Sequence, residues 1–165
     1  MGILAPREYH HSIQDISLAA LREQGITLLV LDLDETLIPR ETERIPSSTK
    51  KWIEEARQSG FSLCIASNNR RPYRVKLISN QLQIPFISLA MKPFPFAFRS
   101  IFKRFFAKAK TTAIIGDQLL TDILGGNFLG LYTILVDPMT EETFPPRQLL
   151  RRAERWLFKG LHIIR

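Results

Sequence analysis

Two acidic segments of the chain contain the residues best suited to chemistry. Asp32 and Asp34 follow one apolar run of strand length, and Asp117 and Asp122 follow another. If the runs are neighbouring strands, up to four carboxylates converge, and each pair at 4 Å repels by about 4 kcal/mol at an effective dielectric constant near 20. Protons or a cation must offset this repulsion. Because carboxylate oxygens and water suit octahedral Mg²⁺ better than Zn²⁺, we expect Mg²⁺ as the cofactor.

Two polar segments supply what an acidic pocket lacks. Ser67 and Asn68 follow a further apolar run, and a hydroxyl with turn N–H groups near a helix start binds phosphate oxygens. Lys92 follows the next short run and can balance both the aspartates and a phosphoryl group. Together the four segments predict one site for a metal-bound phosphate.

The elements that must position these residues alternate between strand length and helical period. This pattern predicts an α/β fold, a three-layer Rossmann-like parallel sheet with helices on both faces. We expect strands near 28–32, 61–67, 86–87, 113–117 and 132–136, and helices near 12–24, 47–59, 72–83, 95–108, 119–128 and 146–158. The unbroken apolar run at 28–31 predicts a central strand. Ser12 and Ser47 are candidate N-caps, and Gly25 and Gly60 are candidate left-handed helix ends.

Length and composition indicate one globular domain over residues 1–165. The chain is 45% apolar and 24% charged, which excludes a disordered or collagenous protein. Its 23 Lys and Arg against 16 Asp and Glu give a net charge of +7 and favour anionic partners. The lone cysteine, Cys64, lies in an apolar run and is expected in the core. Neither a base-reading motif nor a zinc ligand set is found, so no nucleic acid is expected as a partner.

The ordered set of motifs resembles the haloacid dehalogenase (HAD) superfamily of phosphohydrolases. The resemblance rests on Asp32-Leu33-Asp34-Glu35-Thr36, Ser67-Asn68-Asn69, Lys92-Pro93 and Gly116-Asp117 with Asp122, and it covers about residues 26 to 138. The capless subclass IIIA is most similar, and within it the YqeG-type group related to phosphatidylglycerophosphate phosphatases. Glu35 departs from that group, which often carries Asn there. Only about ten residues, 38–47, separate the first motif from the next helix, so no cap domain is expected.

The resemblance implies a role for each motif residue. Asp32 is implied as the nucleophile that forms an aspartyl phosphate, and Asp34 as the acid and base. Mg²⁺ is implied to be held by Asp32, Asp117 and the Asp34 backbone carbonyl, with Ser67, Asn68 and Lys92 facing the phosphoryl oxygens. Thr36 and Asp122 are expected to support the loop and to orient the other groups.

Several residues outside these motifs have structural interpretations. His10, His11 and His162 lack ligand spacing and are expected at the surface. The segment 94–106 holds six of the 11 phenylalanines; four apolar residues follow helical spacing and are expected on the sheet, namely Phe98, Ile101, Phe102 and Phe105. Phe94, Phe96 and Phe106 are not explained by that stripe. The basic amphipathic segment 146–158 fits equally a helix on anionic lipid and one covering its own domain.

The substrate is the least constrained part of the sequence reading. The resemblance to phosphatidylglycerophosphate phosphatases, together with an open site and basic, aromatic segments, implies a phosphorylated, lipid-borne substrate, phosphatidylglycerophosphate, and peripheral contact with an anionic membrane. A soluble nucleotide or sugar phosphate is the alternative, and a non-catalytic receiver-like module phosphorylated on Asp32 is the alternative of another class. Without a secretory signal or an apolar run of spanning length, we expect a cytoplasmic protein, at most peripheral on the inner face of a membrane.

Overall fold

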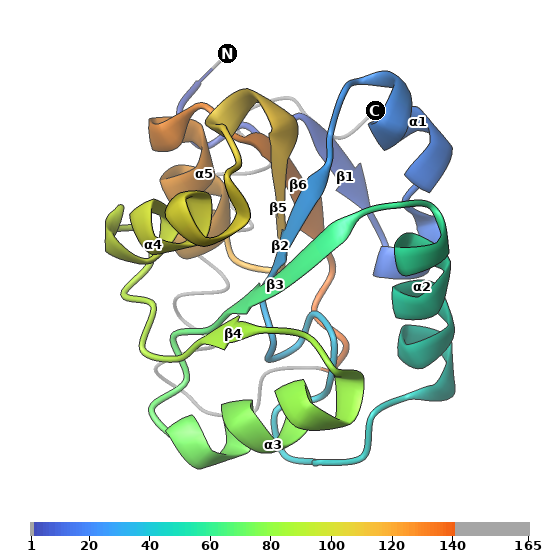
Figure 1. The fold of residues 1–165 in the computed structure, drawn as a ribbon. Coiled ribbons are helices and arrows are strands. Elements are labelled where there is room, and N and C mark those ends of the chain that lie inside the picture. Colours follow the sequence, from blue (N-terminus) through green and yellow to red (C-terminus); the bar gives the residue numbers. More distant parts are fainter. Residues whose placement is uncertain (1, 141–165) are drawn as a thin grey trace.

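The computed structural model describes residues 2–140, which form a single parallel sheet with helices on both faces (Figure 1). The strands are β1 (Glu8–His10), β2 (Leu28–Leu31), β3 (Ser62–Ala66), β4 (Phe86–Ile87), β5 (Thr112–Gly116) and β6 (Tyr132–Val136). The helices are α1 (Leu18–Glu23), α2 (Ser47–Gln58), α3 (Pro72–Leu82), α4 (Phe96–Phe105) and α5 (Leu124–Leu129). The strand order is β1-β6-β5-β2-β3-β4. The predicted α/β fold is therefore confirmed, and β2 is central.

The unbroken apolar run of β2 arises because both faces of the sheet are covered. Leu29 and Leu31 point into a core built with α1, α2 and α3, whereas Leu28 and Val30 point into a second core built largely with α4. Successive side chains of a strand alternate between faces, so a strand between two helical layers is apolar at every position. Cys64 lies in the second core and is 1% exposed, as expected.

Glycines allow the helix turns and a close contact between helix and sheet. Gly25 and Gly60 adopt φ values of 76° and 81°, so both predicted left-handed positions are confirmed. A Cβ at Gly126 of α5 would lie 2.6 Å from side-chain carbons of both Ile114 and Thr133. This contact holds α5 directly against β5 and β6.

The structure differs from the sequence prediction in three segments. The edge strand β1 was missed, because three residues carry too little pattern and are ordered by pairing with β6. The predicted helix over 12–24 is wrong in its first turn. A 3-10 turn (Ile13–Asp15) comes first, and Ser17, not Ser12, caps α1 by accepting the Ala20 N–H. Helix 119–128 begins as a π turn, Leu119–Ile123.

Other predictions concern residues at the helix starts or outside the described part. Ser47 is the first residue of α2, whose N-cap is Pro46. His10 is half-buried beside Glu8, and His11 is exposed. The helix expected over 146–158 and His162 lie outside the described residues, and a single domain over 1–165 stays a prediction. Within residues 2–140 no separate cap is present between the strands and helices that flank the motifs.

Candidate active site

The four motifs meet at one edge of the sheet because β2, β3 and β5 are parallel neighbours. Leu31 at the end of β2 pairs with Ile65 of β3 and Ile115 of β5. The Asp32 N–H donates to the Ile115 carbonyl at 2.9 Å, which extends the ladder by one residue. The residues that follow each strand therefore emerge side by side at the carboxyl edge, where open α/β sheets bind ligands.

Three carboxylates are brought together at this edge. Oxygens of Asp32, Asp117 and Asp122 lie within 4.8 Å of one another, and these residues are only 6%, 4% and 0% exposed. The Thr36 hydroxyl donates to Asp117 Oδ1 at 3.3 Å. Asp122 thus converges with Asp32 and Asp117, as the sequence allowed, and its expected role in orienting the other groups stays a prediction.

Lys92 is the cation within this cluster. Its Nζ lies 2.5 Å from Asp32 Oδ1 and 2.6 Å from Asp122 Oδ1, and the residue is 4% exposed. The Asn68 side chain fixes the Lys92 backbone through two hydrogen bonds of 2.8 Å: its amide donates to the carbonyl, and its oxygen accepts the N–H. Asn68, predicted to face phosphate, therefore uses its side chain to position Lys92.

Gly116 makes room for Asp122. A Cβ at Gly116 would lie 2.2 Å from Asp122 Oδ2 and 2.7 Å from its Cβ. The Asp122 side chain thus passes directly over the end of β5, where its Oδ2 also accepts the Gln118 N–H at 3.2 Å. Any side chain at position 116 would displace this carboxylate from Lys92.

Asp34 has different partners from Asp32. Its Oδ2 accepts a hydrogen bond from the Asn69 amide at 2.6 Å, and its Oδ1 is paired with the buried guanidinium of Arg74. Its carboxylate lies outside the cluster of three, and the metal contact expected from its backbone carbonyl stays a prediction. The two acids that follow β2 thus lie in separate environments, as two different chemical roles require.

Ser67 and Glu35 shape the loops around the acids. Ser67 is 1% exposed, and its hydroxyl accepts the Asn69 N–H at 3.1 Å. Glu35 has a left-handed backbone, φ 67°, and its carboxylate accepts the N–H groups of Arg40 and Thr140, each at 2.8 Å. Glu35 therefore ties the loop after Asp34 to the segment after β6.

Sequence reasoning missed Arg74. This residue is 4% exposed, pairs with Asp34, and donates to the carbonyls of Pro39 and Thr42 at 3.0 and 2.8 Å. Its position was the available signal, because residues 74, 75, 78 and 82 share the buried stripe of α3. A charged residue on such a stripe must have a buried partner.

Buried charge determines the protonation of the cluster. Burial raises the pKa of Asp32 to about 8, and the carboxylates of Asp122 and Asp117 add to this effect, while Lys92 opposes it. Burial alone would lower the pKa of Lys92, but Asp122 and Asp32 outweigh burial and raise it. Three buried carboxylates thus face one ammonium group. An all-oxygen, negatively charged set of this kind fits a hard divalent cation.

The raised pKa of Asp32 predicts pH-dependent metal binding. Below about pH 8 the cation must displace the proton, so the Kd for Mg²⁺ should rise by up to about tenfold for each pH unit of acidification. Above this pH the affinity should level off. Calorimetric titration of the metal-free protein with Mg²⁺, in buffers of different ionisation enthalpy, measures both the Kd and the proton released. A Kd that stays constant from about pH 6 to 8 would contradict the prediction.

Arg74→Ala should lower kcat by about 10- to 100-fold with a smaller change in KM, because Asp34 and the loop at 39–42 lose a shared anchor. Arg74→Lys should recover only part of the rate, since an ammonium group lacks the guanidinium fork that makes these three contacts. Steady-state kinetics and thermal unfolding of both variants test this. Arg71→Lys, at an exposed position three residues earlier, is the control. An equal kcat for Arg74→Ala and the unaltered protein would show that Arg74 does not position Asp34 for the reaction.

Comparison with known proteins agrees with this geometry. A family model described as haloacid dehalogenase-like hydrolase matches residues 29–91, and a HAD-hydrolase-like model matches residues 89–143. The probable phosphatase YqeG of Bacillus subtilis (strain 168) is 36% identical over 94% of this chain and 90% of its own length. The chain belongs to the haloacid dehalogenase-like hydrolase family.

Further similarities are more distant. Phosphatidylglycerophosphate phosphatase 1 (chloroplastic/mitochondrial) of Arabidopsis thaliana is 28% identical over 92% of this chain and 49% of its own length. An uncharacterized protein from Listeria monocytogenes serotype 4b shares the fold with a TM-score of 0.59 at 18% identity, over 84% of this chain and all of its own. With the family model and the relatives of known class, the chain is a HAD-type phosphatase. The non-catalytic receiver-like module considered as an alternative is therefore not supported.

Proposed function

We propose that the chain is a Mg²⁺-dependent phosphomonoesterase that works through an aspartyl phosphate on Asp32 and hydrolyses phosphatidylglycerophosphate. The observation that carries the mechanism is the separation of the two acids after β2. Asp32 lies with Lys92 in the buried cluster, and Asp34 lies with Arg74 and Asn69.

The proposed reaction has two halves. An Asp32 carboxylate oxygen attacks phosphorus while the bond from phosphorus to the ester oxygen breaks, and Asp34 gives its proton to the departing oxygen. In the second half Asp34 takes a proton from water, the water oxygen attacks phosphorus, and inorganic phosphate leaves Asp32. Lys92 and Ser67 face the phosphoryl oxygens.

The metal would be held by the acidic cluster. Asp32 and Asp117 are the proposed ligands, joined by the Asp34 backbone carbonyl, and the position of Asp122 places a third carboxylate nearby. When bound, Mg²⁺ offsets the repulsion between the anionic nucleophile and the anionic substrate. The ion pair with Asp122 then holds the Lys92 ammonium group in place beside the metal ligands.

Two observations support a lipid substrate. The first is the similarity to a relative named phosphatidylglycerophosphate phosphatase 1, which adds to the subgroup resemblance of the motifs. The second is the absence of a cap within residues 2–140, because an open site admits a phosphate carried at a surface. The products would be phosphatidylglycerol and inorganic phosphate.

Phosphate release from phosphatidylglycerophosphate in mixed detergent micelles tests the substrate. We expect it to be faster than release from nucleotide and sugar phosphates at equal concentration. Turnover of soluble esters without release from the lipid would overturn the lipid assignment and support a soluble substrate. That alternative has a specific basis, since a ribulose-1,5-bisphosphate 5-phosphatase of Halopiger xanaduensis is 26% identical over 61% of this chain and 45% of its own length.

A further inference from the structure

The segment between β4 and α4 presents apolar side chains to solvent beside the site. Four residues are 53–60% exposed and are here called the apolar rim: Leu89, Met91, Phe94 and Phe96. Ala90 and Lys92, which alternate with the first two, are 2% and 4% exposed. The stretch that delivers Lys92 to the carboxylates therefore turns apolar groups outward.

The backbone of the rim is unusual. Leu89 and Met91 both adopt left-handed conformations, with φ values of 51° and 54°, which large side chains rarely do. Such conformations are costly for a residue with a Cβ, and outside helix ends they cluster at functional sites. Here they keep two aliphatic side chains out of the core.

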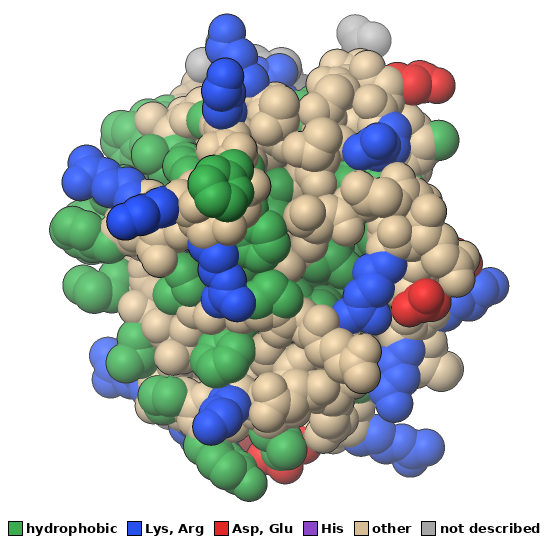
Figure 2. Space-filling view, in the orientation of Figure 1, with side chains coloured by type: hydrophobic (Ala, Val, Ile, Leu, Met, Phe, Trp, Pro, Cys, Tyr) green, Lys and Arg blue, Asp and Glu red, His purple; other side chains and the backbone are tan. Residues whose placement is uncertain are grey.

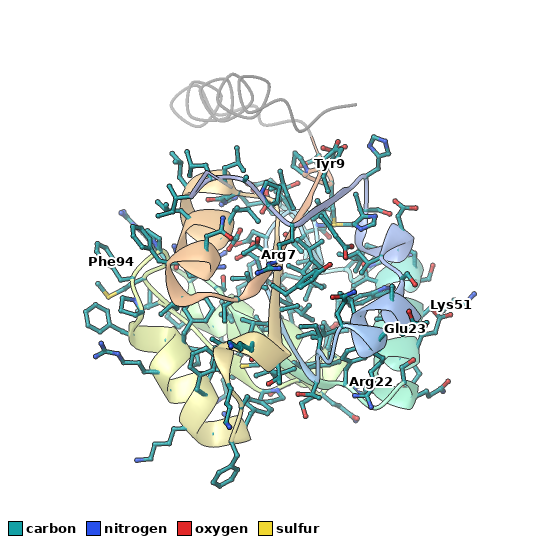
Figure 3. The ribbon with its side chains drawn as sticks, turned by 90° about the horizontal axis from the view of Figure 1, so that it is seen from above. Arg7, Tyr9, Arg22, Glu23, Lys51 and Phe94 are labelled. Atoms are coloured by element: carbon teal, nitrogen blue, oxygen red, sulfur yellow. The ribbon has the colours of Figure 1, made fainter. Side chains whose placement is uncertain are left out.

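The two aromatic residues of the rim lie side by side. The rings of Phe94 and Phe96 lie 6.3 Å apart between centroids. Figure 3 shows Phe94 at the outer edge of the molecule, directed away from the sheet and on the side opposite Lys51 of α2. Contiguous exposed apolar groups on a soluble surface mark an interaction site.

The part of the chain that carries the rim is strongly cationic. From residue 56 to residue 116 the sequence contains eleven Lys and Arg and not one Asp or Glu. Eight of these eleven are exposed: Arg70, Arg71 and Arg99 lie in the loop after β3 and the first turns of α4, next to the rim, Lys108 lies near Phe106 at the opposite edge of the sheet, and the others are Lys76, Lys103, Arg104 and Lys110. Figure 2 shows Lys and Arg spread over this face, with hydrophobic side chains along the edge near α4 and acidic groups only at its margins.

The rim is joined to the active site by short connections. Asn68 bonds the Lys92 backbone, so the loop carrying Arg70 and Arg71 is tied to the segment that carries the rim. A Cβ at Gly125 of α5 would lie 3.0 Å from Pro93 Cα, so the same segment is held from its other side. A surface that covers the rim therefore meets the edge of the sheet where the aspartates lie.

We propose that the apolar rim inserts into the boundary between headgroups and acyl chains of an anionic bilayer, with the surrounding Lys and Arg on lipid phosphates. Exposed Leu and Met beside aromatic rings favour acyl chains over nucleic acid, which stacks on aromatic groups but gains little from aliphatic ones. This inference rests on the proposed function, because docking brings the site to lipid-borne phosphate. None of the helices within residues 2–140 is long and apolar enough to span a bilayer.

The test is sedimentation with vesicles of phosphatidylcholine, with and without phosphatidylglycerol. The unaltered protein should bind the anionic vesicles, and the double variant Phe94→Ser with Phe96→Ser should bind at least about tenfold more weakly. Arg99→Gln with Lys103→Gln should weaken binding and reduce its dependence on salt. Turnover of p-nitrophenyl phosphate should be unchanged in all of them.

Phe106→Ser is the matched control, because Phe106 is 96% exposed but lies with Thr27 and Thr111 at the opposite edge of the sheet. It should bind vesicles like the unaltered protein. Failure of the active, unaltered protein to bind vesicles would overturn the docking proposal, as would equal binding by the rim variant. So would rim-dependent binding of RNA, or rim-dependent self-association, in place of vesicle binding. Loss of p-nitrophenyl phosphate turnover is a separate outcome that tests the proposed function alone.

Discussion

Asp32→Asn should lower kcat by at least about 10⁴-fold, because an amide oxygen is a poor nucleophile and cannot form the acyl phosphate. The fold should be retained. Lys92 keeps its ion pair with Asp122 at 2.6 Å, and the substitution removes one of three mutually repelling carboxylates. Turnover of p-nitrophenyl phosphate with Mg²⁺, together with thermal unfolding, measures both effects.

The matched control for this variant is Asp137→Asn. Asp137 is a carboxylate with a side chain 45% exposed, and it accepts hydrogen bonds from Tyr9 and His11 on the β1 side of the sheet, outside the cluster of three. Its amide variant should keep full turnover. If Asp32→Asn kept more than about one hundredth of the rate while folding normally, Asp32 would not be the nucleophile.

Lys92→Gln should have the second largest effect, acting on both stability and rate. It leaves Asp32, Asp117 and Asp122 buried without their cation, and breaking a buried ion pair from one side costs about 3–5 kcal/mol of unfolding free energy. The kcat/KM should fall by about 10³-fold, because the group proposed to face the phosphoryl oxygens is lost.

The pH dependence of this variant identifies the cause of its instability. Without Lys92 the pKa of Asp32 should rise further, since the ammonium group is what opposes burial there. Protonation then relieves the repulsion, so the loss of stability should shrink as pH falls and grow as pH rises. Chemical denaturation in EDTA across this range measures it, with Lys76→Gln, an exposed lysine of α3, as the control. A loss of unfolding free energy that does not change with pH would indicate a packing defect instead of charge repulsion.

The local sequence pattern was sufficient to predict the architecture of the sheet and the position of the aspartates that follow β2. The apolar run Leu28–Leu31 and the aspartates that follow it predicted a central strand with its acids at one edge, and β2 has this position. Helical spacing placed Phe98 and Ile101 on the sheet, where both are 0% exposed. These features depend on residues that are close together in the chain, so the sequence carries them directly.

Predictions were wrong where the sequence pattern is short or where two residues fit the same role, as at β1 and at the start of α1. β1 has three residues and exists because Tyr9 pairs with Leu135 in β6, a partner far away in the sequence. Ser12 and Ser17 are both good caps, and the burial of Ile13 and Ile16 in the core allows the helix to start only after Ser17. Such choices depend on packing, which propensity does not record.

By itself the sequence determined the kind of fold, the four motifs and the all-oxygen character of the site, because strand length, helical period and residue type are local properties. Only the tertiary structure decided how charge is shared among them. It placed Asp122 beside Lys92, gave Arg74 to Asp34, and turned Asn68 toward the Lys92 backbone. These pairings join segments 24 to 40 residues apart, and they form because a buried charge or amide must find a partner among whatever groups the fold brings near.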